Sequence, residues 1–185
     1  MKEGDELLWL TIAAAIILIS LYFFYSTKKV KQEVGQGEKK KELSHPDFKQ
    51  IQALAKKIQP NLERKLIVNG HFAEEKERKV TTLTHFSYIL IGDKQAQTIQ
   101  VLSYHPETKE VGEIGKFTLQ QVELSTPTEV QAMYSFTDRS NNVTYVETLA
   151  VENAGDYAGQ ISFDQSVMFS AFREWVEEAH KETKA

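Results

Sequence analysis

The sequence predicts an α+β protein: one N-terminal transmembrane helix, then an antiparallel β-sheet or partly open barrel with an N-terminal amphipathic helix and a C-terminal capping helix. Three observations predict this arrangement. An uncharged apolar run lies near the N-terminus, β-rich segments alternate with turn residues in the middle, and apolar residues recur at helical spacing on both sides of those segments. The expected division is a tail at 1–6, a transmembrane helix at 7–25, a polar linker at 26–44 and a soluble domain at 45–185.

The apolar run extends from Leu7 to Tyr25 and contains no charged residue, Gly or Pro. Nineteen helical residues are about 28 Å long, enough to cross a hydrocarbon core of about 30 Å. Trp9 at one end and Tyr22 and Tyr25 at the other are amphipathic side chains suited to the two interfaces. A secretory signal would have a basic head and a small-residue cleavage site, and neither is present. We therefore expect an uncleaved anchor, with the lipid bilayer as the partner of residues 7–25.

Lysine asymmetry predicts the orientation of this anchor, because basic flanks stay in the cytoplasm. Only Lys2 precedes the helix, whereas six lysines follow it closely: Lys28, Lys29, Lys31, Lys39, Lys40 and Lys41. The sequence thus predicts a single-pass protein of the cell membrane with a cytoplasmic C-terminal domain. The linker lysines serve solvation and topology in one interpretation and attract anionic lipid in another. Glutamates lie among these lysines and would weaken the attraction to anionic lipid, so the interpretation as solvation and topology is favoured.

The soluble domain is expected to begin with an amphipathic helix. Ser44 is the predicted N-cap and Pro46 suits the first turn. Apolar residues then follow at steps of three and four: Phe48, Ile51, Ala55, Ile58 and Leu62. This stripe is expected to dock on the following sheet, with a partner or membrane-surface helix as the alternative.

Seven extended segments are predicted after Arg64, and the turn residues between them indicate an antiparallel meander. The segments are 66–68, 80–91, 98–104, 111–117, 121–124, 130–136 and 143–151. Predicted turns include Asn69-Gly70, Gly92-Asp93 and the stretch 138–142. The cluster Gly112 to Lys116 is interpreted as a turn or bulge.

A second amphipathic helix ends the chain, and Asp164 is its predicted N-cap. Its apolar side holds Met168, Phe172, Trp175 and Ala179. We expect Phe172 and Trp175 to form the core of a capping helix that closes one end of the sheet.

Seven strands followed by a helix with the stretch FSAFREWVEEA resemble the pleckstrin-homology-like superfamily over residues 65–182. In that family a bent, nearly closed antiparallel sheet is capped by a C-terminal helix whose tryptophan packs into the core. The resemblance implies a basic phosphate-binding loop between the first two strands. The candidate contact residues there are Lys76, Arg78 and Lys79, among which Glu74, Glu75 and Glu77 are interspersed.

No catalytic, cofactor-binding or metal-binding residue is predicted. The chain has no cysteine, which excludes disulfides, thiolate metal sites and thiol nucleophiles. Its five histidines lack metal-ligand spacing, and the nucleophile-elbow, phosphate-loop and dinucleotide motifs are absent. A net charge of -4 and the lack of a basic aromatic groove predict no nucleic-acid partner.

These observations favour a non-enzymatic, membrane-anchored binding or scaffolding module, of bacterial type, whose partner is an unidentified membrane-associated protein. The expected contact surface is the loop Glu74–Lys79 with any open sheet edge. One alternative is an assembly subunit of a bacterial secretion or conjugation apparatus with its domain outside. The order of parts in this chain, which is tail, spanning helix, helix and curved sheet, is similar to that of the nuclear-transport-factor-like domains found in such assembly subunits. An enzyme of unknown type is the second alternative.

Overall fold

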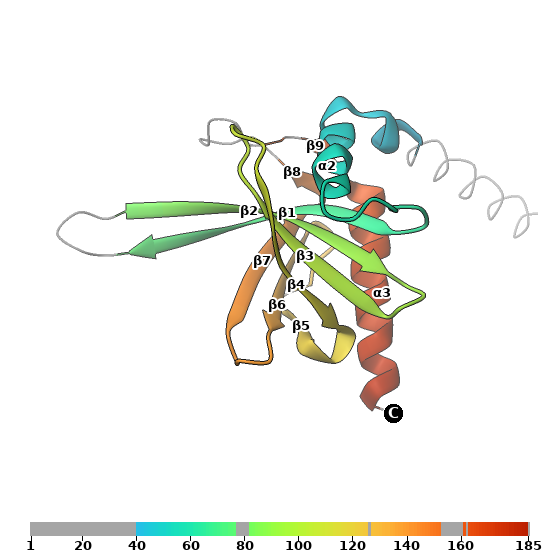
Figure 1. Ribbon diagram of the computed structural model, residues 1–185. Coiled ribbons are helices and arrows are strands. Elements are labelled where there is room, and N and C mark those ends of the chain that lie inside the picture. Colours follow the sequence, from blue (N-terminus) through green and yellow to red (C-terminus); the bar gives the residue numbers. More distant parts are fainter. Residues whose placement is uncertain (1–39, 77–81, 126, 153–160, 162, 185) are drawn as a thin grey trace, which may run out of the picture. The chain divides into compact units, whose positions relative to one another are not determined.

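The computed structural model of the protein describes residues 40–76, 82–125, 127–152, 161 and 163–184 (Figure 1). The chain divides into two compact units, and the second begins at Lys41, four residues before the boundary that the sequence suggests. It contains the helices α2 (Pro46–Lys56), the short η1 (Leu119–Gln121) and α3 (Ser166–Lys184), and residues 40–44 are also helical. Its strands are β1 (Leu66–Lys76), β2 (Thr82–Asp93), β3 (Thr98–Tyr104), β4 (Val111–Thr118), β5 (Val122–Ser125), β6 (Gln131–Thr137), β7 (Val143–Leu149), β8 (Val151–Glu152) and β9 (Phe163–Asp164).

Seven of the strands form one antiparallel sheet in the order β4-β3-β2-β1-β7-β6-β5, and β8 and β9 form a separate pair. The predicted α+β class with an antiparallel sheet and a C-terminal helix is therefore confirmed. No ladder joins β4 to β5 within the described residues, so the sheet is open at both ends.

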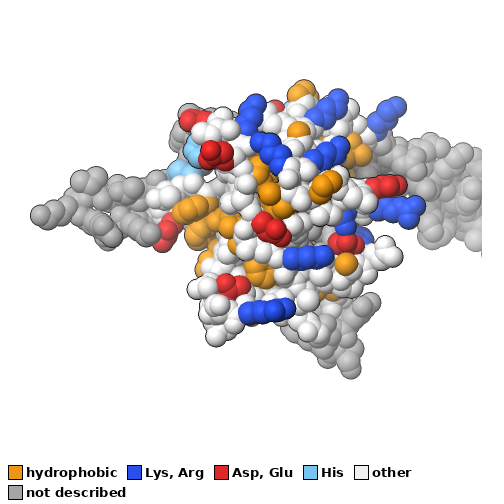
Figure 2. All heavy atoms as spheres, viewed as in Figure 1, with side chains coloured by type: hydrophobic (Ala, Val, Ile, Leu, Met, Phe, Trp, Pro, Cys, Tyr) orange, Lys and Arg blue, Asp and Glu red, His pale blue; other side chains and the backbone are white. Residues whose placement is uncertain are grey.

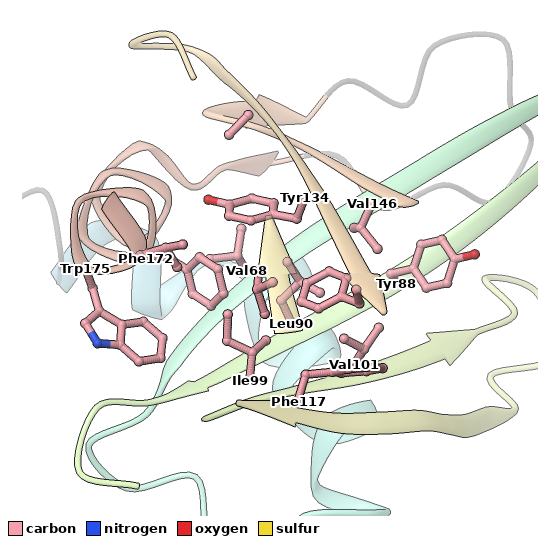
Figure 3. Close-up of a cluster of buried hydrophobic side chains, with 14 of the residues drawn as sticks. Val68, Tyr88, Leu90, Ile99, Val101, Phe117, Tyr134, Val146, Phe172 and Trp175 are labelled. Atoms are coloured by element: carbon pink, nitrogen blue, oxygen red, sulfur yellow. The ribbon is translucent and has the colours of Figure 1, made fainter. Parts of the chain in front are cut away.

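The sheet rolls up so that its two ends face each other. Phe117 belongs to the end strand β4 and Phe136 to β6, near the other end, yet their ring centroids are 5.3 Å apart. The space between them is filled by apolar side chains from both halves of the sheet, including Val68, Leu90 and Tyr134 (Figure 3). This inner core holds the two halves together by burial of apolar surface.

Helix α3 covers one end of this inner core. Phe172 and Trp175 are 1% and 5% exposed, and their rings meet edge to face at 5.8 Å. Gly92 of β2 lies directly beneath them, because a Cβ atom there would come within 2.6 Å of Trp175 Cζ3. The absence of a side chain at residue 92 thus allows the indole to pack onto the strand. Tyr88 lies at the other end of the cluster (Figure 3).

Helix α2 covers the outer face of β1, β2 and β3. Its stripe of Phe48, Ile51, Leu54 and Ala55 is buried, and with Ile67, Ile89, Ile91 and Leu102 it forms a second core. The central part of β2 is consequently buried on both faces, which explains its uninterrupted apolar run at 88–91.

The predicted turn at Asn69-Gly70 is wrong, because both residues lie inside the long strand β1. A Cβ atom at Gly70 would come within 2.6 Å of Val146 Cγ1, so the glycine permits close approach to β7. The Asn69 side chain is buried, and its Oδ1 accepts a hydrogen bond from the Tyr104 hydroxyl at 2.8 Å. Asn69 and Gly70 are residue types that favour turns, but in this strand both make contacts with residues distant in the sequence.

The helix caps also differ from those that the sequence predicts. His45, not Ser44, is the N-cap of α2, and its Nδ1 accepts from the Asp47 backbone N–H. Helix α3 begins at Ser166. The Asp164 carboxylate accepts a hydrogen bond from the Ser166 N–H, but not from the next two backbone N–H groups of the helix. Glu42 accepts from those two, the Val167 and Met168 N–H groups.

Candidate binding surface

The β1–β2 hairpin extends beyond the rest of the sheet (Figure 1). These two strands pair along their whole length, from Leu66↔Gly92 to Lys76↔Thr82. Their neighbours stop earlier, since β3 pairs with β2 only from Ser87 onward and β7 pairs with β1 only at His71. Residues 72–76 and 82–86 therefore form a two-stranded projection, which we call the arm. Both outer edges of the arm lack a ladder partner among the described residues.

The arm contains part of the predicted contact loop. Glu74, Glu75 and the Lys76 backbone belong to β1 instead of a loop, whereas Arg78 and Lys79 lie outside the described residues. The structure therefore places the first half of the predicted contact segment on a strand, and the grouping of its three basic side chains stays a prediction.

Four aromatic side chains lie at the base of the arm. Phe72 and Phe86 are directly opposite each other across β1 and β2. The Phe72 ring stacks on Tyr145 of β7 at 5.7 Å, and the Phe86 ring stacks on Tyr88 at 6.5 Å. Phe86 and Tyr145 are 38% and 47% exposed, whereas Tyr88 is buried. These residues, the arm aromatic cluster, extend the inner core to the surface at the end away from Trp175.

A contact between His71 and Glu147 fixes the base of the arm to β7. Nε2 of His71 lies 3.2 Å from Oε2 of Glu147, the one residue of β7 with which β1 pairs. The Gln131 side-chain amide donates to the other oxygen of the same carboxylate. Because both partners are mostly buried, this contact orients the arm where the ladder between β1 and β7 ends. His71 thus has a structural partner on β7.

The edges of the sheet differ in how they are protected against strand addition. Strand β4 is interrupted by a bulge at Ile114, because Val101 pairs with Gly115 and Leu102 with Glu113. It also carries charged residues, and β5 is only four residues long. Bulges, charges and short length all disfavour pairing with another chain. The β2 edge of the arm, Thr-Leu-Thr-His-Phe at 82–86, contains no Lys, Arg, Asp or Glu.

The anchor residues Leu7, Trp9, Tyr22 and Tyr25 lie outside the described residues. Among the helices that the structure does describe, none is long and apolar enough to cross a membrane. Across the same described ranges, no group of three or more His, Asp or Glu side chains is arranged to hold a metal ion.

Comparison with protein-family models, with curated proteins and with solved structures finds no match to this chain. The function proposed below therefore depends on the sequence and the geometry alone.

Sequence reasoning missed two features of this surface. The arm aromatic cluster brings together residues from three strands. The periodicity of a single strand shows that one of its faces is apolar, but not which residues of other strands it meets. The Glu147 contact depends on the pairing of β1 with β7, which are some seventy residues apart. The sequence does contain a signal for a long β1, because the alternation of apolar and polar residues that starts at Leu66 continues past Gly70 to Phe72.

Proposed function

We propose that this chain is a membrane-tethered, non-enzymatic binding module whose arm engages an extended segment of a membrane-associated partner protein. Two features support the proposal. The run at 7–25 has the length and composition of a transmembrane helix. The β2 edge of the arm contains no Lys, Arg, Asp or Glu, has no neighbouring strand among the described residues, and carries the exposed Phe86 ring. Strand addition to such an edge supplies main-chain hydrogen bonds, and the rings supply side-chain specificity.

The single observation that carries this function is the arm itself. The uncharged edge at 82–86 continues the sheet after β3 has ended, and the β3–β4 turn bends away toward α2, where Lys57 Nζ donates to the Lys109 carbonyl. A partner strand would therefore meet open backbone instead of the neighbouring turn. Phe86, which is 38% exposed, lies on this edge for apolar contact, and the exposed Tyr145 of β7 stacks on Phe72 at the β1 side of the arm.

We further propose that the domain is pleckstrin-homology-like. The strand order β4-β3-β2-β1-β7-β6-β5, the open rolled sheet and the C-terminal helix with buried Trp175 all support this assignment. In that family the ligand-binding loop joins the first two strands, which is the position of the arm here. The chain departs from the family pattern in the acidic residues of that segment, a difference that favours a protein partner over a phosphate.

Site-specific crosslinking tests the binding mode. A photoreactive phenylalanine at Phe86 is expected to crosslink one reproducible protein in native membranes, and the same group at Ile114, on the bulged edge, is not. The variant Phe86→Ala/Tyr145→Ala should lower capture of that protein at least tenfold. Ile114→Ala/Val130→Ala removes two similarly exposed apolar side chains and should leave capture unchanged. Equal capture by both variants would exclude the arm as the binding surface.

Thiol labelling in intact cells tests the orientation, since the chain has no cysteine of its own. With a membrane-impermeant reagent, Gly4→Cys should react and Asn141→Cys should not. The opposite pattern would favour the secretion or conjugation subunit with its domain outside. The enzyme alternative gains support if the purified protein turns over a substrate and substitutions in one hollow abolish turnover without unfolding the domain.

A further inference from the structure

The α2 side of the domain carries an excess of positive charge. Residues 40–65 contain seven Lys or Arg residues and three acidic ones, in a chain whose net charge is -4. One of those acids, Glu42, is buried and engaged by the N-terminus of α3. Its charge is therefore screened from this surface, and the basic excess facing solvent is larger than the sequence count indicates.

Six exposed cations lie on α2 or in the turns that follow α2, β2 and β3, and we call them the α2 basic face: Lys49, Lys56, Lys57, Arg64, Lys94 and Lys109. Lys57 Nζ donates to the Lys109 carbonyl at 2.6 Å, which joins the end of α2 to the β3–β4 turn. Arg64 and Lys94 line a surface hollow of about 650 Å³ together with Lys65 and two acidic residues, Glu63 and Asp93. Figure 2 shows Lys and Arg side chains gathered over the α2 part of this view.

The C-terminal part of the domain has the reverse charge. The described residues from Leu119 onward include ten acidic residues and four Lys or Arg residues. Four of the acids, Glu174, Glu177, Glu178 and Glu182, lie on α3. Such an uneven distribution produces an electric field that orients the domain near a charged surface with its basic side toward negative charge.

We propose that the α2 basic face docks on the anionic lipid headgroups of the bilayer in which the chain is anchored. This proposal rests on the transmembrane anchor at 7–25 that is part of the proposed function, and it adds a defined orientation of the domain at the membrane. Fourteen residues, 26–39, connect the expected end of the span to residue 40, nine residues before Lys49 of this face. Even fully extended they reach only about 50 Å, so the face meets the bilayer repeatedly at high effective concentration.

Charge and position favour lipid over other polyanions. Lysines near an anionic leaflet contribute about 1 kcal/mol each, so a few exposed ones hold a tethered domain against its membrane. Nucleic-acid binding relies on a domain with a clear basic excess, whereas this chain is acidic in total. The arm aromatic cluster packs with the inner core, on the face of β1 and β2 opposite α2, so docking on lipid leaves it available to a partner.

Reconstitution of the full chain tests this orientation. A fluorophore at Ala53→Cys, exposed on α2 between Lys49 and Lys56, reports on the basic face, and one at Ser140→Cys reports on the β6–β7 turn. The vesicles are phosphatidylcholine, alone or with phosphatidylglycerol, and they carry a headgroup quencher. We expect quenching at residue 53 but not at 140, only with phosphatidylglycerol, and its loss in high salt.

Charge reversal provides the matched control. Lys49→Glu/Lys56→Glu should lower the docked fraction at least tenfold, given about fivefold for each lysine lost. Arg139→Glu/Lys181→Glu changes the net charge equally on other surfaces and should leave docking unchanged. Quenching at residue 53 that is equal in both lipids, or equal in both variants, would overturn the proposal. Failure of the chain to co-float with phosphatidylcholine vesicles would instead overturn the anchor.

Discussion

Oε1 of Glu42 lies 3.1 Å from the backbone nitrogen of Met168, 126 residues later in the chain. The other carboxylate oxygen accepts from the Val167 N–H at 3.0 Å, so one side chain caps the terminal helix from outside it. A carboxylate there satisfies two free N–H groups and interacts favourably with the helix dipole. The segment expected to be a linker is thereby fixed to the last helix of the domain.

Removing this cap is expected to destabilise the domain. Glu42→Ala should lower the free energy of unfolding by about 1–2 kcal/mol, as for other lost N-caps. Urea unfolding of the full chain in detergent, followed by tryptophan fluorescence in a Trp9→Phe background, measures this. Glu63→Ala removes an exposed carboxylate and should change stability by less than about 0.5 kcal/mol. Equal effects of the two variants would show that the cap contributes nothing.

Gly92 and Trp175 should be energetically coupled, because a Cβ atom at residue 92 would overlap the indole. Gly92→Ala is expected to cost about 1–3 kcal/mol through overpacking. Trp175→Ala should cost about 3–5 kcal/mol, as for other buried large aromatics. In the double variant the added methyl no longer meets the indole and contacts only Phe172, at 3.0 Å, so its cost should fall. A double-mutant cycle from thermal or urea unfolding measures the coupling, and strict additivity would contradict the contact.

Asp93 should make stability depend on pH in the acid range. The Lys65 ammonium, hydrogen-bonded to the Asp93 carboxylate at 2.5 Å, holds the pKa of that carboxyl below its ordinary value, with help from the Ala96 N–H. A pKa lower in the folded than in the unfolded chain adds stability above the unfolded value of about 3.9. That stability disappears as pH falls through the folded pKa.

The stability of wild type and Asp93→Asn should therefore differ by a constant amount, under about 1 kcal/mol, between pH 5 and 7, as estimated for exposed pairs. The difference should shrink as pH falls below about 4. Urea unfolding across this range measures it. Lys65→Met should reduce the same difference, because it removes the main cause of the pKa shift. If the difference in stability between wild type and Asp93→Asn grew as the pH fell, the predicted direction of the pH dependence would be wrong.

Gln165 should stabilise the junction of β1 with α3. Its side chain accepts from the Asn69 N–H at 2.8 Å and donates to the Asn69 and Leu149 carbonyls at 3.0 and 2.8 Å. Gln165→Met keeps the volume but removes partners from three backbone groups, so we expect a loss of about 2–4 kcal/mol. The Asn69 amide proton should also exchange faster with solvent. Gln95→Met, at an exposed turn, is the control.

The residues of α2 show how much of the fold followed from sequence. Their apolar spacing predicted both the helix and its buried face, because only one side of an amphipathic helix can be removed from water. The alternation in Thr98–Tyr104 likewise predicted β3 with its exact ends. The contact segment expected at Glu74–Lys79 falls partly on the arm, and binding there stays a prediction.

By itself the sequence determined the α+β class, most strand positions and the apolar faces, since these depend on local periodicity and on burial. Only the tertiary structure decided that Asn69-Gly70 lies inside a strand, that Glu42 caps α3 and that Phe72 meets Tyr145. Asn and Gly favour turns in short peptides, but a close approach to Val146 and a buried hydrogen bond stabilise the extended form here. Contacts between residues far apart in the chain have no local signature, because the partner that stabilises each residue is defined only when the sheet rolls up.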